Sequence, residues 1–561
     1  MRCYLLTLLA LLPLLSLPAN ANPIVTVRNG SYEGLSLPQY QQDLFLGIPY
    51  AQDTGGHNRF RIPQSLTETW NGTRLAHNYS DACPDANPTA DAVYGMSENC
   101  LSINVVRPSN ASKSSGAGLP VLLWIHGGSY QEGTSGLDNY NLTWIVQKSA
   151  KMGKPIIGAS INYREGGWGS MYSIEIQGSG NTNLALRDMR KALAWIQENI
   201  ASFGGDPSRV TIWGESSGSF AVGQLLMTYG GRTDGLFHRS IQESGSAMTA
   251  WYNGTSWYQP IYDKIVSQVN CSTAIDTLAC LRTIPYQTLY PYMNSSIVGG
   301  PGFYPTVDGD IMPAYPTQLL QTGRFARVPH ILGTNSDEGT ANAPQGINTD
   351  ADLYTFLLND TGFDFPPATV KQIMRLYPDD PTQGIPLNTG TERFADYGWQ
   401  YKRAAAIMGD VFYHGPRLAD ARRYADFSPT YVYRFNTRPF ANNTNSTWTD
   451  TVGSLAPAAV GVKHFSEVAF VFGNPADVGP WREYEELSDR MMEMWIRFAG
   501  EGDPNAGTEE GVWPVYDGVG DGKGRNLVLQ TESQGGFYVE EDVYRLAGRE
   551  YLDRWARRRH V

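Results

Sequence analysis

Arg209-Val-Thr-Ile-Trp-Gly-Glu-Ser-Ser-Gly218 is the stretch of sequence that decides the fold. Residues 209–213 form a short run of β-branched and aromatic side chains, which predicts a buried strand. The five residues that follow match the pattern G-x-S-x-G, in which a serine stands on a tight turn between a strand and a helix. Bulky side chains would clash at Gly214 and Gly218, so we expect the turn to project the side chain of Ser216 above the sheet.

Strands and helices alternate around this turn, between residues 120 and 245. Continuous apolar runs at residues 120–125 and 155–161 predict strands that are buried on both faces. A helix ahead of the turn is indicated by apolar residues that recur every three or four positions, namely Leu186, Met189, Leu193, Ile196 and Ile200. This order of strands and helices predicts an α/β fold with a large, mostly parallel central sheet that helices flank on both faces.

The same arrangement indicates where a negatively charged oxygen would be stabilised. The helix after Ser216 begins with free backbone N–H groups and a positive electrostatic potential. We expect a second set of donors from His126-Gly-Gly-Ser-Tyr130, because this segment follows a predicted strand and its glycines allow close approach to a substrate oxygen. Alone it would be an ordinary glycine turn, but its position favours an oxyanion site.

A serine nucleophile needs a base, and in a fold of this type the acid and then the histidine follow the serine along the chain. Three histidines lie late enough in the sequence: His414, His464 and His560. His560 lies in the C-terminal tail, and His414 lies in a helical stretch where a structural role is expected. His464 lies in a loop before the apolar run at residues 468–472, so it is the predicted base.

The predicted acid lies in the loop Gly333-Thr-Asn-Ser-Asp-Glu-Gly339, which follows a strand-like segment at residues 329–332. Both Asp337 and Glu338 could orient a histidine, and their chemistry alone does not separate them. No CxxC pair is present, so no zinc site is predicted. A serine, a histidine and a carboxylate can hydrolyse an ester without a metal or an organic cofactor, and we expect none.

Composition and the first residues of the chain restrict the class of protein. The 55 Asp and Glu residues outnumber the 43 Lys and Arg residues, and the net charge of −12 argues against a nucleic-acid or anionic-membrane binder. Residues 1–21 combine a positive start, an apolar run and a small-x-small cleavage site, which predict a signal peptide. Residues 22–561 are expected to form a single domain without a stable membrane anchor, since no later segment is long and apolar enough.

Cysteine usage and glycosylation sequons agree with export to the extracellular space. Once Cys3 has left with the signal peptide, four cysteines remain, which allow three pairings. Proximity along the chain favours the disulfides Cys83–Cys100 and Cys271–Cys280 in an oxidising compartment. N-x-S/T sequons predict an N-glycosylated surface and occur at Asn29, Asn71, Asn78, Asn110, Asn141, Asn253, Asn270, Asn294, Asn359, Asn442 and Asn445.

Several motifs together resemble the type-B carboxylesterase/lipase family, the α/β-hydrolases that include cholinesterases and secreted fungal lipases. Phe45-Leu-Gly-Ile-Pro-Tyr50 looks like the opening of this family, and Ser97-Glu-Asn-Cys-Leu-Ser-Ile-Asn-Val105 is similar to its cysteine signature. Further segments that look like the family's are residues 59–60, 214–218, 244–246, 337–339 and 461–472. The resemblance spans essentially all of residues 22–561, and it implies an α/β-hydrolase fold with long loop and helical insertions.

The resemblance also implies catalytic roles for individual residues. Ser216 would be the nucleophile, His464 the base, and Glu338 rather than Asp337 the acid. The backbone N–H groups that stabilise the oxyanion would be those of Gly128, Ser129 and Ser217.

Supporting roles are implied in the same way. Glu215 and Glu467 would support the histidine from behind, and Trp251 would line the acyl pocket. Arg59 would pair with Glu98, and the four cysteines would form the family's two disulfides.

Some positions depart from the family's usual pattern. Ser129 stands in place of the third glycine of the oxyanion segment, and Ser217 in place of an alanine. Both positions would act through their backbone N–H groups, so these changes are compatible with the expected chemistry. Asn99 replaces an acidic residue, and Glu165 stands where an apolar residue is usual. These departures bear on the rate and fit of the substrate rather than on the class of enzyme.

The leading interpretation is a secreted hydrolase of small-molecule carboxylic esters that works through an acyl-enzyme. A non-catalytic adhesion protein of the same fold is disfavoured, because all three expected catalytic residues are present. A true lipase or sterol esterase is the other alternative, but residues 84–99, where a lipase carries an amphipathic lid, are short and mostly polar. The same loop has no Trp for a choline head group, which disfavours a cholinesterase. The sequence leaves the oligomeric state open.

Overall fold

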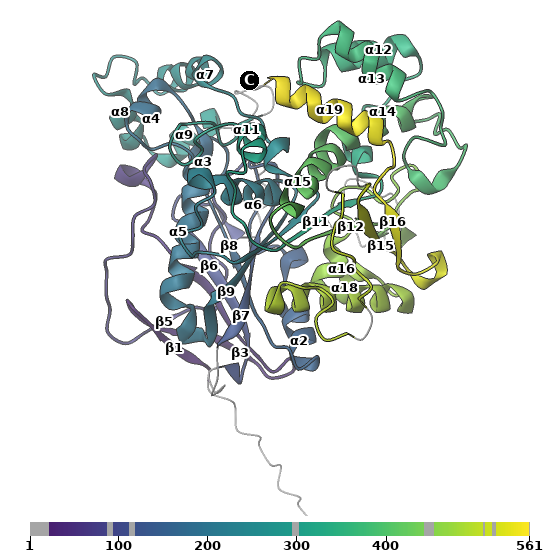
Figure 1. The fold of residues 1–561 in the computed structure, drawn as a ribbon. Coiled ribbons are helices and arrows are strands. Elements are labelled where there is room, and N and C mark those ends of the chain that lie inside the picture. Colours follow the sequence, from purple (N-terminus) through teal and green to yellow (C-terminus); the bar gives the residue numbers. More distant parts are fainter. Residues whose placement is uncertain are drawn as a thin grey trace, which may run out of the picture.

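Eleven strands form the central sheet of the computed structural model, which describes residues 22–86, 94–111, 118–293, 302–441, 454–508, 511–518 and 523–559 (Figure 1). In spatial order the strands are β16 (Tyr538–Glu541), β15 (Arg525–Leu529), β12 (Thr430–Phe435), β11 (His330–Asn335), β10 (Arg239–Glu243), β9 (Gly205–Glu215), β7 (Leu119–Ile125), β8 (Ile157–Ile161), β6 (Ser102–Pro108), β4 (Gln42–Pro49) and β3 (Leu35–Leu37).

The seven neighbouring strands from β8 to β15 all run parallel, and antiparallel pairings occur only toward the two edges among the described strands. The predicted α/β fold with a large, mostly parallel sheet is therefore confirmed. The predicted signal peptide, residues 1–21, lies outside the described residues. Two small sheets complete the strands: β1 (Ile24–Val27), β2 (Gly30–Glu33) and β5 (Thr73–Leu75) in one, and β13 (Phe440–Ala441) and β14 (Ser454–Leu455) in the other.

Strand β7 shows why helices must cover both faces of the sheet. Its apolar run is buried on both sides: Val121, Leu123 and Ile125 belong to one hydrophobic cluster, and Leu122 and Trp124 belong to another. The first cluster is closed by α5 (Leu184–Asn199), α6 (Ser217–Met227) and α15 (Gly415–Ala425), and the second by α2 (Thr143–Lys151), α16 (Val468–Phe472) and α18 (Arg482–Glu501).

The helix predicted from apolar spacing is α5. Leu186, Met189, Leu193 and Ile196 are all fully buried against the sheet, as the spacing predicts. The strand before the serine turn is longer than the predicted residues 209–213, because β9 begins at Gly205. A shift in register against β7, between Leu119 and Val121, accommodates the additional residues.

Two groups of helices lie beyond the same end of the sheet, at the top of Figure 1. Except for the helix that follows the last strand, they are inserted between core elements, as the resemblance to the family implies. One group is α7 (Thr255–Gln268), α8 (Thr277–Thr283) and α9 (Tyr286–Met293), and the other is α12 (Asp350–Asn359), α13 (Pro367–Leu376), α14 (Tyr401–Gly409) and α19 (Leu546–Arg559). Within the described part of the chain, no helix has the length and apolar character needed to cross a membrane.

Candidate active site

Ser216 occupies the turn between β9 and α6 in a backbone conformation that few residues adopt. Its φ is 56° and its ψ is −126°, and its N–H donates to the carbonyl of Glu243 at 3.0 Å. Neither flanking position has room for a side chain. A Cβ on Gly214 would lie 2.6 Å from the backbone of Gly218, and a Cβ on Gly218 would lie 2.1 Å from the carbonyl oxygen of Ile125. The turn therefore has the geometry that the sequence predicts.

The glycine segment after β7 lies directly against this turn. A Cβ on Gly127 would come within 3.1 Å of the Ser216 Cβ, so the two segments are in contact. The N–H of Tyr130 donates to the Ser217 hydroxyl at 3.1 Å, which ties the segment to the start of α6. Gly128 has a φ of 107°, and a Cβ there would lie 1.7 Å from a carbonyl oxygen, so only glycine fits.

Three backbone N–H groups are available beside Ser216. Those of Gly128, Ser129 and Ser217 donate to no acceptor within the described residues. Ser129 adopts the left-handed conformation, with a φ of 58°, although it has a side chain. The structure thus brings the three expected oxyanion donors close to the predicted nucleophile.

His464 and Glu338 form the charged centre of the site. Nδ1 of His464 lies 2.7 Å from Oε2 of Glu338. The other oxygen of Glu338 accepts hydrogen bonds from the backbone N–H of Asn335 at 2.7 Å and from the hydroxyl of Ser244 at 2.5 Å. Because both oxygens have partners, the carboxylate is held in one orientation against the imidazole.

Asp337, the other acid candidate, is directed elsewhere. Its carboxylate accepts hydrogen bonds from the backbone N–H groups of Leu387 and Val462, each at 2.7 Å. Burial raises its pKa to about 6, although these two hydrogen bonds oppose the shift. Asp337 therefore fastens two loops together, and Glu338 is the residue that meets the imidazole.

Glu215 lies on the opposite side of the imidazole. Its Oε1 is 3.2 Å from Nε2 of His464, close enough for an ion pair, although the angle does not make a hydrogen bond. Among the described residues, Nε2 of His464 has no hydrogen-bond partner, and this includes Ser216. Burial raises the pKa of Glu215 well above its usual range. Burial lowers the pKa of His464, but the carboxylates of Glu215 and Glu338 outweigh it and raise that pKa to about 9.

Glu467 lies one layer further from the imidazole. Its Oε1 lies 3.0 Å from the hydroxyl oxygen of Ser244, and the amide of Asn335 donates to its second oxygen. Burial, together with the nearby charge of Glu338, raises its pKa to about 7. Ser244 thus contacts both Glu338 and Glu467, a bridging role that sequence reasoning missed. The only signal was its place in the family-like segment 244–246.

His414, the other candidate histidine that the structure describes, does not reach this centre. His414 is buried, its Nδ1 lies 3.0 Å from the hydroxyl of Thr334, and burial lowers its pKa to about 3. His560 lies outside the described residues. Sequence reasoning also missed Tyr413, whose ring lies 4.6 Å from the His464 ring, centroid to centroid. Its position next to His414 in a helical stretch gave no indication of this contact.

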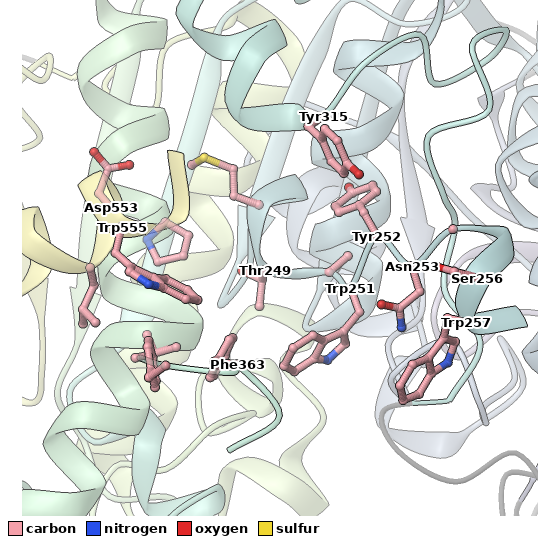
Figure 2. Close-up of a pocket in the computed structure, with 17 residues that line it drawn as sticks. Thr249, Trp251, Tyr252, Asn253, Ser256, Trp257, Tyr315, Phe363, Asp553 and Trp555 are labelled. Atoms are coloured by element: carbon pink, nitrogen blue, oxygen red, sulfur yellow. The ribbon is translucent and has the colours of Figure 1, made fainter. Parts of the chain in front are cut away.

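Trp251 lines a cavity of about 360 Å³ (Figure 2). Trp251 stacks on Phe363 at 4.7 Å and contacts Phe412 edge-on at 6.4 Å. Phe412 in turn contacts Tyr413, so a chain of rings leads from the cavity to His464. Neither Ser216 nor His464 lines the cavity itself. The role of this cavity as the acyl pocket is therefore a proposal.

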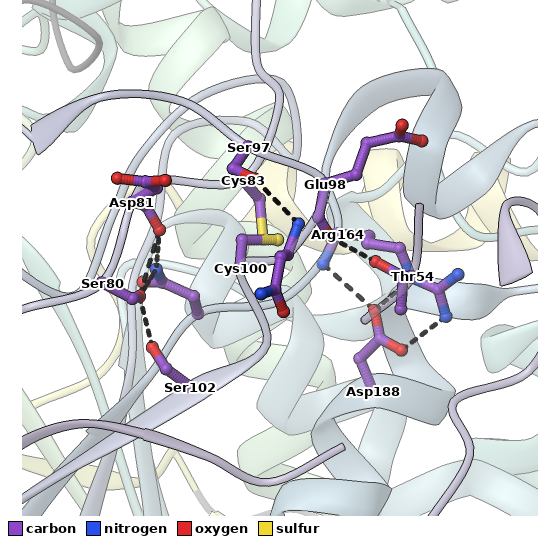
Figure 3. Close-up of a disulfide and its surroundings, with 12 residues drawn as sticks. Thr54, Ser80, Asp81, Cys83, Ser97, Glu98, Cys100, Ser102, Arg164 and Asp188 are labelled. Atoms are coloured by element: carbon purple, nitrogen blue, oxygen red, sulfur yellow. Dashed lines mark hydrogen bonds and ion pairs between the residues drawn. A yellow bond between two sulfur atoms is a disulfide. The ribbon is translucent and has the colours of Figure 1, made fainter. Parts of the chain in front are cut away.

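Both expected disulfides are present, and Figure 3 shows the first of them, Cys83–Cys100. Beside it, Arg59 and Glu98 form the expected ion pair, with Nε–Oε1 and Nη2–Oε2 distances of 2.6 and 2.7 Å. Residues 87–93, the middle of the loop that was predicted to be a poor lid, lie outside the described residues. No group of three or more His, Cys, Asp or Glu side chains in the described ranges is arranged to hold a metal ion.

The fold and this site together define an α/β-hydrolase. A family model described as "Carboxylesterase family" matches residues 21–544, and the chain belongs to this family.

Relatives of known name support the same class. The chain is 32% identical to "Lipase 4" of Diutina rugosa, over 97% of this chain and 98% of that protein. It is 31% identical to "Secreted lipase 1" of Botryotinia fuckeliana (strain B05.10), over 95% and 93% of the two chains. The crystal structure of Aspergillus niger EstA superposes with a TM-score of 0.80, at 28% identity, over 97% of this chain and 100% of that one. The protein is a carboxylic ester hydrolase.

Proposed function

We propose that this enzyme is a secreted serine hydrolase of small carboxylic esters and that it works through an acyl-enzyme intermediate. Ser216 is the nucleophile, His464 the base and Glu338 the acid. The observation that carries the proposal is the 2.7 Å contact between His464 and Glu338, formed beside a serine on a strained turn.

The reaction proceeds in two similar halves. Ser216 attacks the ester carbonyl while Nε2 of His464 takes its proton, and the developing oxyanion accepts hydrogen bonds from the backbone N–H groups of Gly128, Ser129 and Ser217. The imidazolium then gives the proton to the departing alcohol. Water attacks the acyl-enzyme in the same way and releases the acid. No metal or organic cofactor takes part in these steps.

The surrounding carboxylates stabilise the charge that appears on the imidazole. Glu338 holds the Nδ1 proton and so fixes the tautomer that leaves Nε2 free to act as base. Glu215 and Glu467 add negative charge nearby, which favours the imidazolium formed in each half-reaction. The same charge has a cost, since His464 must lose its proton before it can accept one from Ser216.

Secretion is part of the proposal. It is supported by the signal-like residues 1–21, by the two disulfides and by relatives named as secreted lipases. We further propose that residues 22–561 act as one domain and that some sequons carry glycans. Trp251 and the cavity beside it would receive the acyl part of the substrate.

A true lipase or sterol esterase is the second candidate, because several relatives carry the name lipase. The polar composition of residues 84–99 opposes it, since a lid that opens on oil needs an apolar face. A non-catalytic relative is disfavoured by the intact contact between His464 and Glu338.

Replacement of Ser216 by alanine tests the proposal. The variant should be secreted and folded but should have lost at least about 10⁴-fold in ester turnover. The wild type should release a burst of alcohol from an activated ester, and the variant should not. A variant that keeps more than a tenth of the wild-type rate would refute the assignment of the nucleophile.

A further inference from the structure

Glu165 is a buried acid that the catalytic scheme does not use. It directly precedes α3 (Gly166–Ser170), and only 1% of its surface is exposed. Among the residues that the structure describes, neither of its carboxyl oxygens has a hydrogen-bond partner. A buried charge without a partner is very costly, so this carboxyl group needs another means of staying in the protein interior.

The neighbouring cation does not compensate for Glu165. The guanidinium of Arg164 is engaged elsewhere: Asp188 accepts from its Nε at 2.8 Å and from its Nη2 at 2.6 Å (Figure 3), and the carbonyl of Arg61 accepts from its Nη1 at 2.8 Å. The backbone N–H of Arg164 also donates to Asp188, at 3.1 Å. This double attachment fixes the backbone just before Glu165 and directs the guanidinium away to Asp188.

The charged groups that do act on Glu165 are negative. Burial is the largest influence on its pKa, followed by the carboxylates of Asp85 and Glu132, and all three raise it well above the usual range. Two tyrosines, Tyr140 and Tyr163, also lie within its electrostatic reach, and they are neutral phenols whose own pKa values are raised mainly by burial. The surroundings of Glu165 therefore favour the protonated, uncharged acid at neutral pH.

The residues around Glu165 are connected to the oxyanion segment. The N–H of Gly166 donates to the carbonyl of Tyr130 at 2.6 Å. The N–H of Glu132 donates to the carbonyl of Gly128 at 3.0 Å, and the Glu132 carbonyl packs so closely on Gly128 that no Cβ would fit. Residues 128–132, which we call the oxyanion loop, are thus held at their midpoint, Tyr130, by the residue after Glu165, and their two ends are joined by the contact between Gly128 and Glu132.

We propose that Glu165 is a positioning residue that, as a neutral acid, lets the oxyanion loop lie where its N–H groups meet the substrate, and that ionisation of Glu165 displaces this loop and slows turnover. The inference rests on the proposed function, because the loop matters only if it binds an oxyanion. A negative Glu165 would repel Asp85 and Glu132; Glu165 and Asp85 are both buried, where such repulsion is weakly screened, and Glu132 is half-buried. Because Glu132 is part of the loop, we expect repulsion of its side chain to shift the loop as well.

The expected kinetic signature is a descending limb at alkaline pH. If one ionisation inactivates the enzyme, kcat falls by about tenfold per pH unit above the apparent pKa of Glu165. The fall in kcat should level off at about 10²- to 10³-fold below the maximum, because this is the typical cost of losing an oxyanion donor. The ascending limb belongs to His464 and should not depend on Glu165.

The experiment measures kcat and KM for p-nitrophenyl acetate from pH 6 to pH 10.5, with the Ser216→Ala protein as the blank at each pH. We compare the wild type with Glu165→Gln and Glu165→Leu, neither of which can ionise at this position. Glu541→Gln, at an exposed glutamate on the edge strand β16, is the matched control. Both Glu165 variants should lose the descending limb in kcat and keep the ascending limb, while the control keeps both.

A melting experiment separates positioning from mere packing. The folded chain keeps the Glu165 proton at pH values where an unfolded glutamate, with a pKa of about 4.3, has lost it, so stability falls as the pH rises above that value. Glu165→Leu should therefore melt at a higher temperature than the wild type at pH 8, with a smaller difference at pH 5. A purely structural role would give this shift and leave the descending limb unchanged.

The outcomes are distinct. A descending limb that persists unchanged in whichever Glu165 variant folds overturns the inference while the proposed function stands. Turnover that survives Ser216→Ala refutes the proposed function and the inference with it. Loss of the limb in the Glu165 variants but not in Glu541→Gln supports the role of Glu165.

Discussion

Replacement of Glu215 by glutamine should move the ascending limb of the pH–rate profile to lower pH. Oε1 of Glu215 lies 3.2 Å from Nε2 of His464, which is the atom that must be unprotonated to accept the serine proton. Burial lowers the pKa of His464, but Glu215 and Glu338 outweigh it and raise the pKa to about 9. The free enzyme therefore gains its neutral base only as the pH approaches that value.

The size of the effect follows from the contact. An opposite charge at this distance raises the pKa of a histidine by about 1 to 3 units, and Gln carries no charge to do so. The limb in kcat/KM should fall from about 9 to roughly 6 to 8. At pH 7 the neutral fraction of His464 would then rise from about one in a hundred to at least roughly one in ten. Glu338 remains in place, so the ring keeps its orientation.

The assay is kcat/KM for a soluble ester between pH 5 and pH 10, for the wild type, Glu215→Gln and an exposed control, Glu485→Gln on α18. The plateau of kcat/KM at high pH reports any activity that the substitution loses by disturbing the packing of the turn. The pH at which the limb rises reports the basicity of His464 separately. A limb that stays near pH 9 in Glu215→Gln, or moves upward, would show that Glu215 does not set the basicity of His464.

Three further predictions concern the acid, the acyl pocket and the substrate. Glu338→Gln should lower kcat/KM by several orders of magnitude, about 10⁴-fold where the wrong tautomer results, whereas Asp337→Asn should cost much less; the reverse ranking would exchange the two residues. Trp251→Ala should change the ratio of kcat/KM between long and short acyl chains, because it enlarges the cavity of about 360 Å³. An unchanged ratio in a series of p-nitrophenyl esters would show that the cavity does not bind the acyl chain. The initial rate should rise smoothly with tributyrin concentration through the solubility limit, soluble short- or medium-chain esters should be preferred over an olive-oil emulsion, and a choline ester should have no advantage. A jump in rate at the solubility limit, together with strong turnover of the emulsion, would indicate a true lipase. Preference for the choline ester would indicate an unrecognised cation site.

The parts of the fold that could be predicted from the sequence are those that local pattern controls. The apolar run of β7 is best buried as a strand with both faces covered, and the apolar spacing of α5 is best buried as a helix with one face covered. Both elements could therefore be predicted directly. The serine turn is equally local, because Gly214 and Gly218 are required by contacts within a few residues or with the adjacent strand. The start of β9 was not visible, since it depends on a shift of register against its neighbour.

The choice between Asp337 and Glu338 shows where chemistry alone is insufficient. Both are acids at the end of β11, one residue apart, and either could orient an imidazole. The chain enters a short helical turn at Glu338, and the two carboxylates meet different partners. Asp337 meets backbone N–H groups from two distant loops, and those contacts exist only in the folded chain.

The electrostatics of the site are the least local property of all. Glu215, Glu243, Glu338 and Glu467 are far apart in the sequence, yet the carboxyl ends of parallel strands and the loops beyond them gather all four into one buried region. Only one cation, the imidazolium of His464, arises at their centre in the proposed reaction. Burial raises the pKa of Glu215 and of Glu467, whereas the positive charge of His464 lowers both, so the protonation of these acids is coupled to that of the imidazole. Glu165 is the contrasting case: it is equally buried, but within the described residues its oxygens have no hydrogen-bond partner, and the charges that act on it are those of Asp85 and Glu132.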